Sequence, residues 1–319
     1  MAKKNSIVIE LFYKYVLIEN PEEFQKKHLA FCKRLGIKGK VLVAKEGING
    51  SVSGTRMQVE KYKKELTSDQ RFKNITFKEQ LWNKHPFDRM FVRIRKEIVT
   101  SGFDVEIKEG KISNKGVHIS PEKFKEWLDN KEDIIIFDAR NDYETRIGKF
   151  KNAICPDIET FSELPDVIPK LAEHKHKKIV MYCTGGVRCE KASALFKKKG
   201  FKKVYQLKGG IINYGSKFPD DTHWEGLCFV FDKRLSTPIG KTPLFTNKNA
   251  ITTCAWCGIE CGNYTNCRNI QCDAMFISCN KCKSDYYNAC SGNCKKKIEN
   301  NGVESEVRNR VRSKRDENQ

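Results

Sequence analysis

The chain has 319 residues, with 60 Lys and Arg against 40 Asp and Glu, which gives a net charge of +20 and a pI near 9.3. With 39% hydrophobic and 31% charged residues it is expected to be globular, and no apolar run approaches the about 20 residues that a membrane-spanning helix needs. The length predicts two or three domains, and the positive charge favours a polyanionic partner over a membrane. The first residues lack the apolar stretch of a signal peptide, so we expect a cytoplasmic protein.

Residues 1–100 predict a ferredoxin-like βαββαβ domain, because the pattern reads strand, helix, strand, strand, helix, strand. The helices are expected to begin at Pro21, with a stop at Gly36, and near the cap residue Thr55. The sequence Gly47-Ile-Asn-Gly50 is interpreted as a tight turn. Strands are expected at 7–16, 41–44, 51–53 and 91–99, with a further segment at 75–77.

The same segment is strongly basic. It holds 22 Lys and Arg against 11 Asp and Glu, more than half of the chain's excess charge. A surface that holds RNA phosphates needs such an excess, although a solvated lysine-rich face is the plain alternative. The candidate RNA-binding residues are Lys38, Lys40, Lys45, Arg89, Arg93 and Arg95. Arg93 and Arg95 are two apart on a predicted strand, so they are expected to project from one face.

A connection at 101–117 leads to a predicted α/β domain at 118–235. Here strands alternate with helices, which indicates a parallel sheet. The strands are expected at 133–137, 179–182 and 204–207, and the helices begin at Pro121 and Cys189. A further helix at 161–171 is weakly indicated, because it contains Pro165 and Pro169.

A loop at the carboxyl end of the strand 179–182 carries the candidate reactive residue. It begins with Cys183, ends with Arg188, and has Thr184, Gly185, Gly186 and Val187 between them. Small residues let successive backbone N–H groups point inward, and the following helix adds its positive end. Such surroundings favour a thiolate, so Cys183 is predicted to be a nucleophile, with Arg188 stabilising negative charge. The alternative is a structural cysteine in an ordinary strand–turn–helix connection.

The region 236–294 predicts a metal-binding module. Nine of the fourteen cysteines lie between Cys254 and Cys294, and two Cys-x-x-Cys pairs are typical of structural zinc. One possible pairing makes two sites and leaves Cys261 over, although spacing does not select it and disulfides are the alternative. Its two sets are Cys254, Cys257, Cys279, Cys282 and Cys267, Cys272, Cys290, Cys294. The charged residues 295–319 are expected to be disordered.

The run Tyr182-Cys-Thr-Gly-Gly-Val-Arg-Cys-Glu-Lys-Ala-Ser193 resembles the oxygen-dependent tRNA uridine hydroxylases, rhodanese-domain proteins that form 5-hydroxyuridine at the wobble position. The resemblance implies an acylphosphatase-like N-terminal domain, a rhodanese-like catalytic domain and molecular oxygen as co-substrate. It also matches Asp138, Arg140 and Glu144 to a rhodanese segment, which we interpret as a supporting ion-pair network. Cys189 is either a resolving thiol or a small buried residue.

Two mechanisms fit Cys183 under this resemblance: addition of its thiolate to carbon 6 of uracil, or a persulfide intermediate. Two other functions also remain possible, a sulfurtransferase that acts on another acceptor and a non-catalytic RNA-binding protein. The sequence contains no dinucleotide-binding fingerprint, so no nucleotide cofactor is expected.

Overall fold

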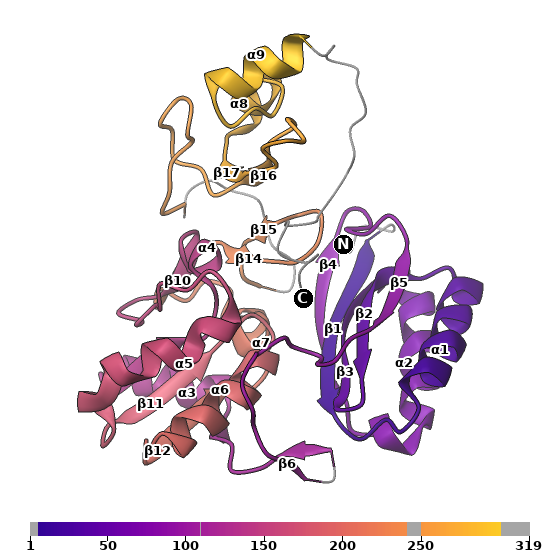
Figure 1. The fold of residues 1–319 in the computed structure, drawn as a ribbon, viewed down its shortest axis with the longest axis vertical. Coiled ribbons are helices and arrows are strands. Elements are labelled where there is room, and N and C mark those ends of the chain that lie inside the picture. Colours follow the sequence, from indigo (N-terminus) through magenta and orange to yellow (C-terminus); the bar gives the residue numbers. More distant parts are fainter. Residues whose placement is uncertain (1–5, 109, 241–249, 301–319) are drawn as a thin grey trace. The chain divides into compact units, whose positions relative to one another are not determined.

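The computed structural model describes residues 6–108, 110–240 and 250–300. The N-terminal domain is a five-stranded sheet with strand order β4-β1-β3-β2-β5, and helices α1 and α2 lie on one of its faces (Figure 1). Its elements are β1 (Ile7–Tyr15), α1 (Pro21–Leu35), β2 (Lys38–Ala44), β3 (Gly47–Gly54), α2 (Arg56–Ser68), the 3-10 helix η1 (Gln70–Phe72), β4 (Thr76–Trp82) and β5 (Met90–Ile94). This confirms the ferredoxin-like βαββαβ fold, with β5 added beside β2 in parallel.

Local sequence fixes the ends of both helices. Asn20 caps the start of α1, and Gly36 ends it in the left-handed conformation that glycine adopts readily. Thr55 and Gln58 form a capping box at the start of α2. The face of the sheet beneath these helices is apolar, with Phe12, Phe77 and Val92 among its buried or half-buried side chains.

Two sequence predictions in this domain were wrong. Gly47–Gly50 is not a turn but the start of β3, and the chain reverses at residues 45–46 instead. Gly47 is needed there because its φ is +147° and an added Cβ would lie 2.1 Å from the carbonyl oxygen of Lys14. The strand expected at 91–99 is also shorter: it ends at Ile94 and is the added strand, whereas β4 completes the βαββαβ unit.

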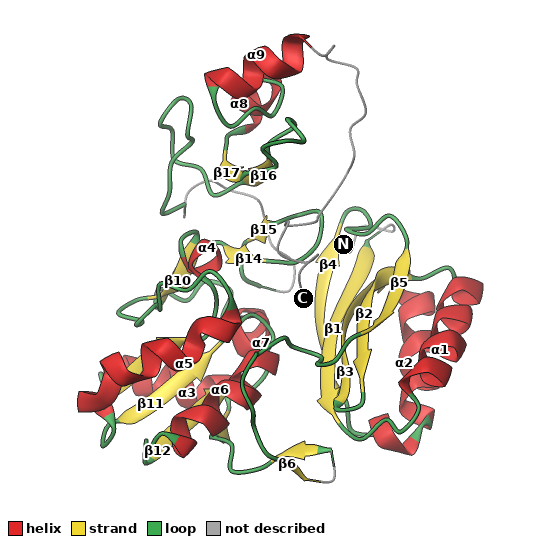
Figure 2. Cartoon of the chain, in the orientation of Figure 1, coloured by secondary structure: helices red, strands yellow, loops and turns green. Residues whose placement is uncertain are grey.

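The central domain contains a four-stranded parallel sheet with strand order β8-β12-β11-β9. Figure 2 shows it with its surrounding helices. Its elements, with the preceding β6–β7 hairpin, are β6 (Ile107–Lys108), β7 (Lys111–Ile112), β8 (Val117–Ile119), α3 (Pro121–Asp129), β9 (Ile134–Asp138), α4 (Asp142–Thr145), η2 (Phe161–Glu163), α5 (Leu164–Val167), η3 (Ile168–His174), β11 (Lys178–Tyr182), α6 (Val187–Lys198), β12 (Lys203–Leu207) and α7 (Gly210–Lys217). The helix expected at 161–171 is divided into η2, α5 and η3, where its two prolines interrupt regular α-helical bonding.

The N-terminal and central domains belong to one compact unit, and residues 146–149, 224–238 and the C-terminal residues form a second. The second unit is built from short elements, so its backbone offers little regular hydrogen bonding. These are β13 (Trp224–Gly226), which pairs with β10 (Gly148–Phe150), then β14 (Cys228–Phe229), β15 (Ser236–Thr237), β16 (Tyr264–Asn266), β17 (Met275–Ile277), α8 (Asn280–Asp285) and α9 (Gly292–Asn300).

The predicted tail begins inside α9, and its part from residue 301 onward lies outside the described residues. Among the helices of the described residues, none is long and apolar enough to cross a membrane.

Candidate active site

The Cys183 loop joins the carboxyl end of β11 to the start of α6 and closes around the sulfur. The backbone N–H of Gly186 donates a hydrogen bond to Cys183 Sγ over 3.1 Å. Gly186 has a φ of +95°, the left-handed conformation that turns this amide inward. Behind the loop, the first turns of α7 hold it in place, because the N–H of Ile211 donates to the Cys183 carbonyl oxygen over 3.0 Å.

Cys183 is fully buried and yet favours the thiolate. Burial opposes ionisation, but it is outweighed by hydrogen bonding from Cys189, by the positive charge of Arg188 and by the backbone N–H groups of Arg188 and Gly186. Together these lower the pKa of Cys183 to about 5. A sulfur with this pKa is almost entirely ionised at neutral pH, as a nucleophile requires.

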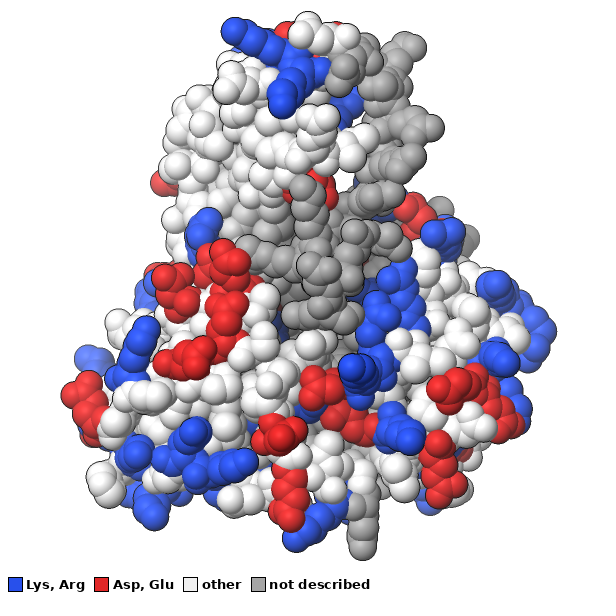
Figure 3. All heavy atoms as spheres, in the orientation of Figure 1, with Lys and Arg blue, Asp and Glu red and all other residues white. Residues whose placement is uncertain are grey.

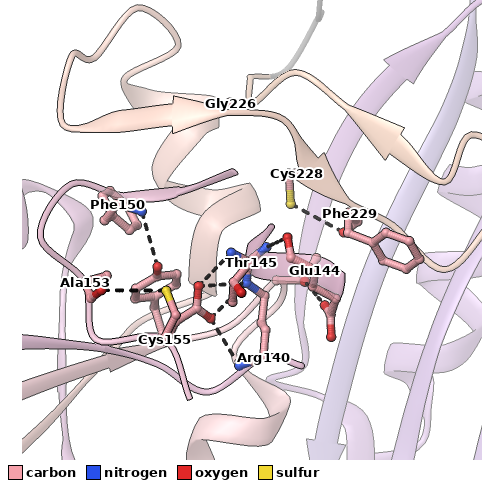
Figure 4. A network of polar contacts seen from close by, with 12 residues as sticks. Arg140, Glu144, Thr145, Phe150, Ala153, Cys155, Gly226, Cys228 and Phe229 are labelled. Carbon is pink, nitrogen blue, oxygen red and sulfur yellow. Dashed lines mark hydrogen bonds and ion pairs between the residues drawn. The ribbon is translucent and has the colours of Figure 1, made fainter. Parts of the chain in front are cut away.

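Two buried ion pairs support the loop. The guanidinium of Arg188 contacts both carboxylate oxygens of Glu144, with Nη2 to Oε1 at 2.8 Å, and Thr184 donates to Oε1 of the same carboxylate. Arg140 and Asp138 form a second bidentate pair, with Nη2 to Oδ2 at 2.7 Å, and neither side chain is exposed. Figure 4 shows Arg140 and Glu144 within this network. Asp138 and Arg140 thus pair with each other as expected, whereas the Glu144 carboxylate pairs with Arg188, and Arg140 reaches Glu144 through a hydrogen bond to its carbonyl oxygen.

Cys189 lies in the first turn of α6 and is fully buried. Burial and its hydrogen bond to Cys183 raise the pKa of Cys189 well above its usual value. It therefore remains a protonated donor to the Cys183 thiolate, which sequence reasoning did not consider for it.

The N-terminal domain contacts the residues that follow the loop. Glu190 accepts hydrogen bonds from Tyr13 on β1 over 3.1 Å and from Lys115 over 2.6 Å. Lys191, which is 1% exposed, lies 3.0 Å from Glu46 and 3.0 Å from Glu97. These ion pairs connect α6 to the N-terminal domain, so residues of both domains surround the reactive loop.

Sequence reasoning missed Tyr13, Glu190 and Lys191, and also Lys78 on β4, whose side chain is 6% exposed and interacts electrostatically with Cys183. Their signal is weak: Tyr13 and Tyr15 alternate along a strand, and Lys78 stands between Phe77 and Glu79 in a segment of mixed polarity. Only sheet register and domain packing bring them to the site.

The predicted RNA-binding residues lie on or beside the sheet of the N-terminal domain. We call the side of this sheet opposite α1 and α2 the helix-free face. Met90 and Val92 pack beneath the helices, so Phe91 and Arg93 project from the helix-free face, and register places Lys40 beside Phe91. The guanidinium carbons of Arg89 and Arg93 lie 4.6 and 5.0 Å from the centre of the Phe91 ring.

The other candidates are more scattered. Lys38 begins β2, and Lys45 is exposed in the turn between β2 and β3. Arg95 lies one residue beyond β5 and donates to the carbonyl oxygen of Ile94, so its expected alignment with Arg93 on one strand was wrong. Figure 3 shows Lys and Arg side chains over the region of β4 and β5.

The second unit brings eight cysteines together as two quartets, Cys254, Cys257, Cys279, Cys282 and Cys267, Cys272, Cys290, Cys294, each with its sulfur atoms within 4.8 Å of one another. Cys257 and Cys279 Sγ are 3.8 Å apart, and Cys272 and Cys290 Sγ are 3.6 Å apart. Four thiolates at about 2.3 Å from a tetrahedral zinc ion lie about 3.8 Å from one another, so the spacing fits. All fourteen cysteines lie in the described residues, and each is present there as a free thiol.

Comparison with known proteins divides the chain in the same way. The family described as UPF0176 acylphosphatase like domain matches residues 7–98, the rhodanese-like domain family matches 120–217, and the family described as Rhodanase C-terminal matches 225–295. The tRNA uridine(34) hydroxylase of Bacillus licheniformis is 44% identical over 92% of this chain and 89% of its own length. The protein of the same name from Bacillus thuringiensis is 44% identical over 92% of this chain and 91% of its own. A rhodanese-like domain protein from Staphylococcus aureus matches 31% of this chain and 91% of its own at 27% identity, with a TM-score of 0.26.

Proposed function

The chain belongs to the tRNA uridine(34) hydroxylase family, and from that premise we propose that it hydroxylates carbon 5 of the wobble uridine of tRNA through the thiolate of Cys183. The observation that carries the proposal is the loop itself. It lowers the pKa of a fully buried thiol to about 5, which a merely structural cysteine has no need of. A tRNA substrate also supports the proposal that the protein acts in the cytoplasm.

The thiolate solves a chemical problem of uracil, whose carbon 5 is a poor nucleophile. When Cys183 Sγ bonds to carbon 6, the π electrons of the C5–C6 bond move through carbon 4 onto O4 and give an enolate. Carbon 5 of that enolate then attacks the oxidant, and the thiolate leaves as carbon 5 loses its proton. With molecular oxygen as oxidant, the second oxygen atom departs as water after a reductant, such as a thiol, supplies two electrons and two protons.

A persulfide on Cys183 is the rival intermediate, and the match to rhodanese-like domains favours considering it. The loop would stabilise the anionic outer sulfur in the same way as the thiolate. Mass spectrometry of the isolated protein separates the two mechanisms, because only the persulfide adds sulfur to the Cys183 peptide before RNA is present.

The helix-free face suits the RNA that carries this uridine. Lys40, Phe91 and Arg93 lie on β2 and β5, while Tyr13 and Lys78 lie on β1 and β4 near the loop. With strands about 4.8 Å apart, the five strands span about 19 Å, enough for a few nucleotides of a single-stranded loop. Phosphates would contact the basic residues, and an unstacked base would contact Phe91.

The access side of the loop is indicated by Gly185. A Cβ added at this residue would meet no atom within 4 Å, whereas Gly186 and Gly210 are closely packed. Cys183 Sγ is covered in the free protein, so the incoming base must displace neighbouring side chains.

For the two cysteine quartets, we infer zinc in a structural role, since four thiolates complete its coordination and leave no position for a substrate.

The decisive experiment measures the mass of the wobble uridine in tRNA from cells that contain the wild-type protein, no protein, Cys183→Ala or Cys155→Ala. The proposal expects one added oxygen with wild type and with Cys155→Ala, whose thiol lies outside the loop. An effect that survives Cys183→Ala would support a non-catalytic RNA-binding protein. An unmodified uridine in the presence of wild-type protein would support a sulfurtransferase with another acceptor.

A further inference from the structure

Lys78 on β4 is a buried cation without an acid partner. Its side chain is 6% exposed. Within the described part of the chain its ammonium has no hydrogen-bond acceptor and no ion pair, and it lies over the Tyr13 ring, whose centre is 4.6 Å from Nζ. A side chain that is so largely buried without an ion pair adds little to stability, which makes Lys78 a candidate for a functional role.

The surroundings of Lys78 are those of the reactive loop. Phe77 and Leu81 pack beneath the helices, so Lys78 projects from the helix-free face, where register sets it beside β1. The Tyr13 ring beneath its ammonium reaches the loop, because the Tyr13 hydroxyl lies 3.2 Å from where a Cβ on Gly186 would stand and donates to Glu190. Of the charges that act on Lys78, that of the Cys183 thiolate is the largest.

The other cations near Cys183 are already engaged. Arg188 is held by both oxygens of Glu144, Lys191 by Glu46 and Glu97, and Lys115 by Glu190. Their positive charges are balanced, and their donors point at carboxylates. Lys78 differs from these three cations: it interacts electrostatically with Cys183, and within the described residues its ammonium has no ion pair, so its donors remain available to a ligand.

We propose that Lys78 is a catalytic residue supplied by the N-terminal domain, and that its ammonium binds O4 of the uracil while Cys183 adds to carbon 6. This rests on the proposed function. Lys78 then stabilises the oxyanion, a role that the loop sequence suggests for Arg188. Arg188 instead positions the loop through its ion pair with Glu144.

The step that Lys78 assists is neutral in redox terms. The S–C6 bond forms, the C5–C6 π bond breaks, and the electron pair appears on O4, where the ammonium donates a hydrogen bond. Burial lowers the pKa of Lys78 to about 8, against the opposing effects of Cys183, Glu10 and Glu190, so it still carries its proton at neutral pH. A charged donor in a site without water stabilises a developing oxyanion strongly.

Hydrogen exchange at carbon 5 tests the step without oxygen. When the enolate takes a proton from solvent, carbon 5 of a deuterium-labelled anticodon stem-loop carries both isotopes. Loss of the deuteron from carbon 5 as the C6–S bond breaks then regenerates uracil with the label exchanged. Under anaerobic conditions and saturating RNA, wild type should exchange, Cys183→Ala should not, and Lys78→Met should be slower by on the order of 100-fold. Lys78→Arg, which keeps the charge, should stay within about tenfold of wild type. Lys26→Met, which removes an exposed charge from α1 of the same domain, is the matched control and should exchange like wild type.

A second readout does not involve RNA. The rate at which iodoacetamide alkylates Cys183 follows its thiolate, and loss of the neighbouring cation in Lys78→Met should move the midpoint upward by about 1 pH unit. Lys26→Met should leave the midpoint in place.

The outcomes separate the two proposals. Absence of exchange by wild type contradicts the addition mechanism of the proposed function. If wild type exchanges and folded Lys78→Met exchanges at the same rate, the role of Lys78 is overturned while the addition mechanism stands. If Lys78→Met does not fold, Lys78→Arg decides, because a loss of on the order of 100-fold in that folded variant contradicts a role that depends on charge.

Discussion

The chain stabilises thiolates in two regions by different means. At Cys183, one sulfur receives hydrogen bonds from Gly186 and Cys189 and lies near Arg188, so the protein itself balances its charge. In the quartets, four sulfur atoms lie within 4.8 Å of one another, and the ammonium of Lys283 is a single positive charge near Cys254 and Cys279, so a metal ion would have to balance most of the charge of four thiolates.

The difference explains what each region can do. A thiolate stabilised by amides and a guanidinium keeps its lone pairs for a substrate. Around a metal ion, the thiolates of a quartet would be fully engaged, and they would hold together a unit with short strands and little apolar core. The first arrangement suits catalysis and the second suits folding.

The largest effect should follow from loss of metal in the second unit. Each structural zinc ion is worth about 10 kcal/mol of folding free energy or more. Cys282→Ser should therefore lower zinc content by one ion per chain and unfold its quartet, measured by metal analysis and limited proteolysis. Cys261→Ser is the control, since Cys261 belongs to neither quartet, and it should keep both ions. Wild-type metal content in Cys282→Ser would contradict the assigned ligands.

A smaller effect on the free energy of unfolding is expected when the loop loses the buried carboxylate of Glu144. Glu144→Gln leaves the guanidinium of Arg188 buried without a balancing carboxylate, which should lower the free energy of unfolding by about 3–5 kcal/mol. Urea denaturation measures the change. Glu173→Gln, at an exposed glutamate, should stay within about 0.5 kcal/mol of wild type. Equal stability of the two variants would show that the Glu144–Arg188 pair does not support the loop.

The rate at which Cys183 is alkylated should depend on pH in a way that distinguishes its thiolate from an ordinary thiol. Its pKa of about 5 is below the usual value, so alkylation should be nearly constant from pH 9 down to pH 6 and should fall as pH drops through 5. Cys189→Ala removes a donor to the thiolate and should raise the midpoint by about 1 pH unit. Cys155→Ala should leave it unchanged. A wild-type midpoint near the ordinary thiol value would refute the account of the loop.

The smallest effect should be on RNA affinity. Lys40→Gln combined with Arg93→Gln removes two candidate phosphate contacts from the helix-free face, which should reduce the slope of log affinity against log salt by about 1.4–1.8. The double variant Lys61→Gln and Lys64→Gln, on exposed positions of α2, is the control. Binding measured at several salt concentrations decides, and equal slopes for the two double variants would remove the helix-free face from the RNA site.

Much of this architecture could be predicted from patterns of residues that lie close together in the sequence. The Cys183 loop lies within one strand–turn–helix unit, and the candidate pairing of the cysteines matches both quartets. Residues whose position depends on register were missed. Tyr13 and Lys78 reach the loop from strands that are more than 100 residues away in sequence, and no local pattern encodes that packing. The turn assigned to Gly47–Gly50 was wrong for a related reason. Gly47 is required by the close approach of β1, and Gly50 is closely packed against Val41 of β2 and Phe12 of β1, so neither marks a reversal of the chain.

The most direct test of the account is mass spectrometry of the Cys183 peptide after the protein is mixed with a uridine-34 anticodon stem-loop without oxygen and quenched. The account predicts a nucleotide joined to Cys183 through sulfur, present with wild type and absent when the uridine is replaced by cytidine. A peptide that carries only an extra sulfur, or one that is unmodified while the wobble uridine is still hydroxylated once oxygen is admitted, would contradict it.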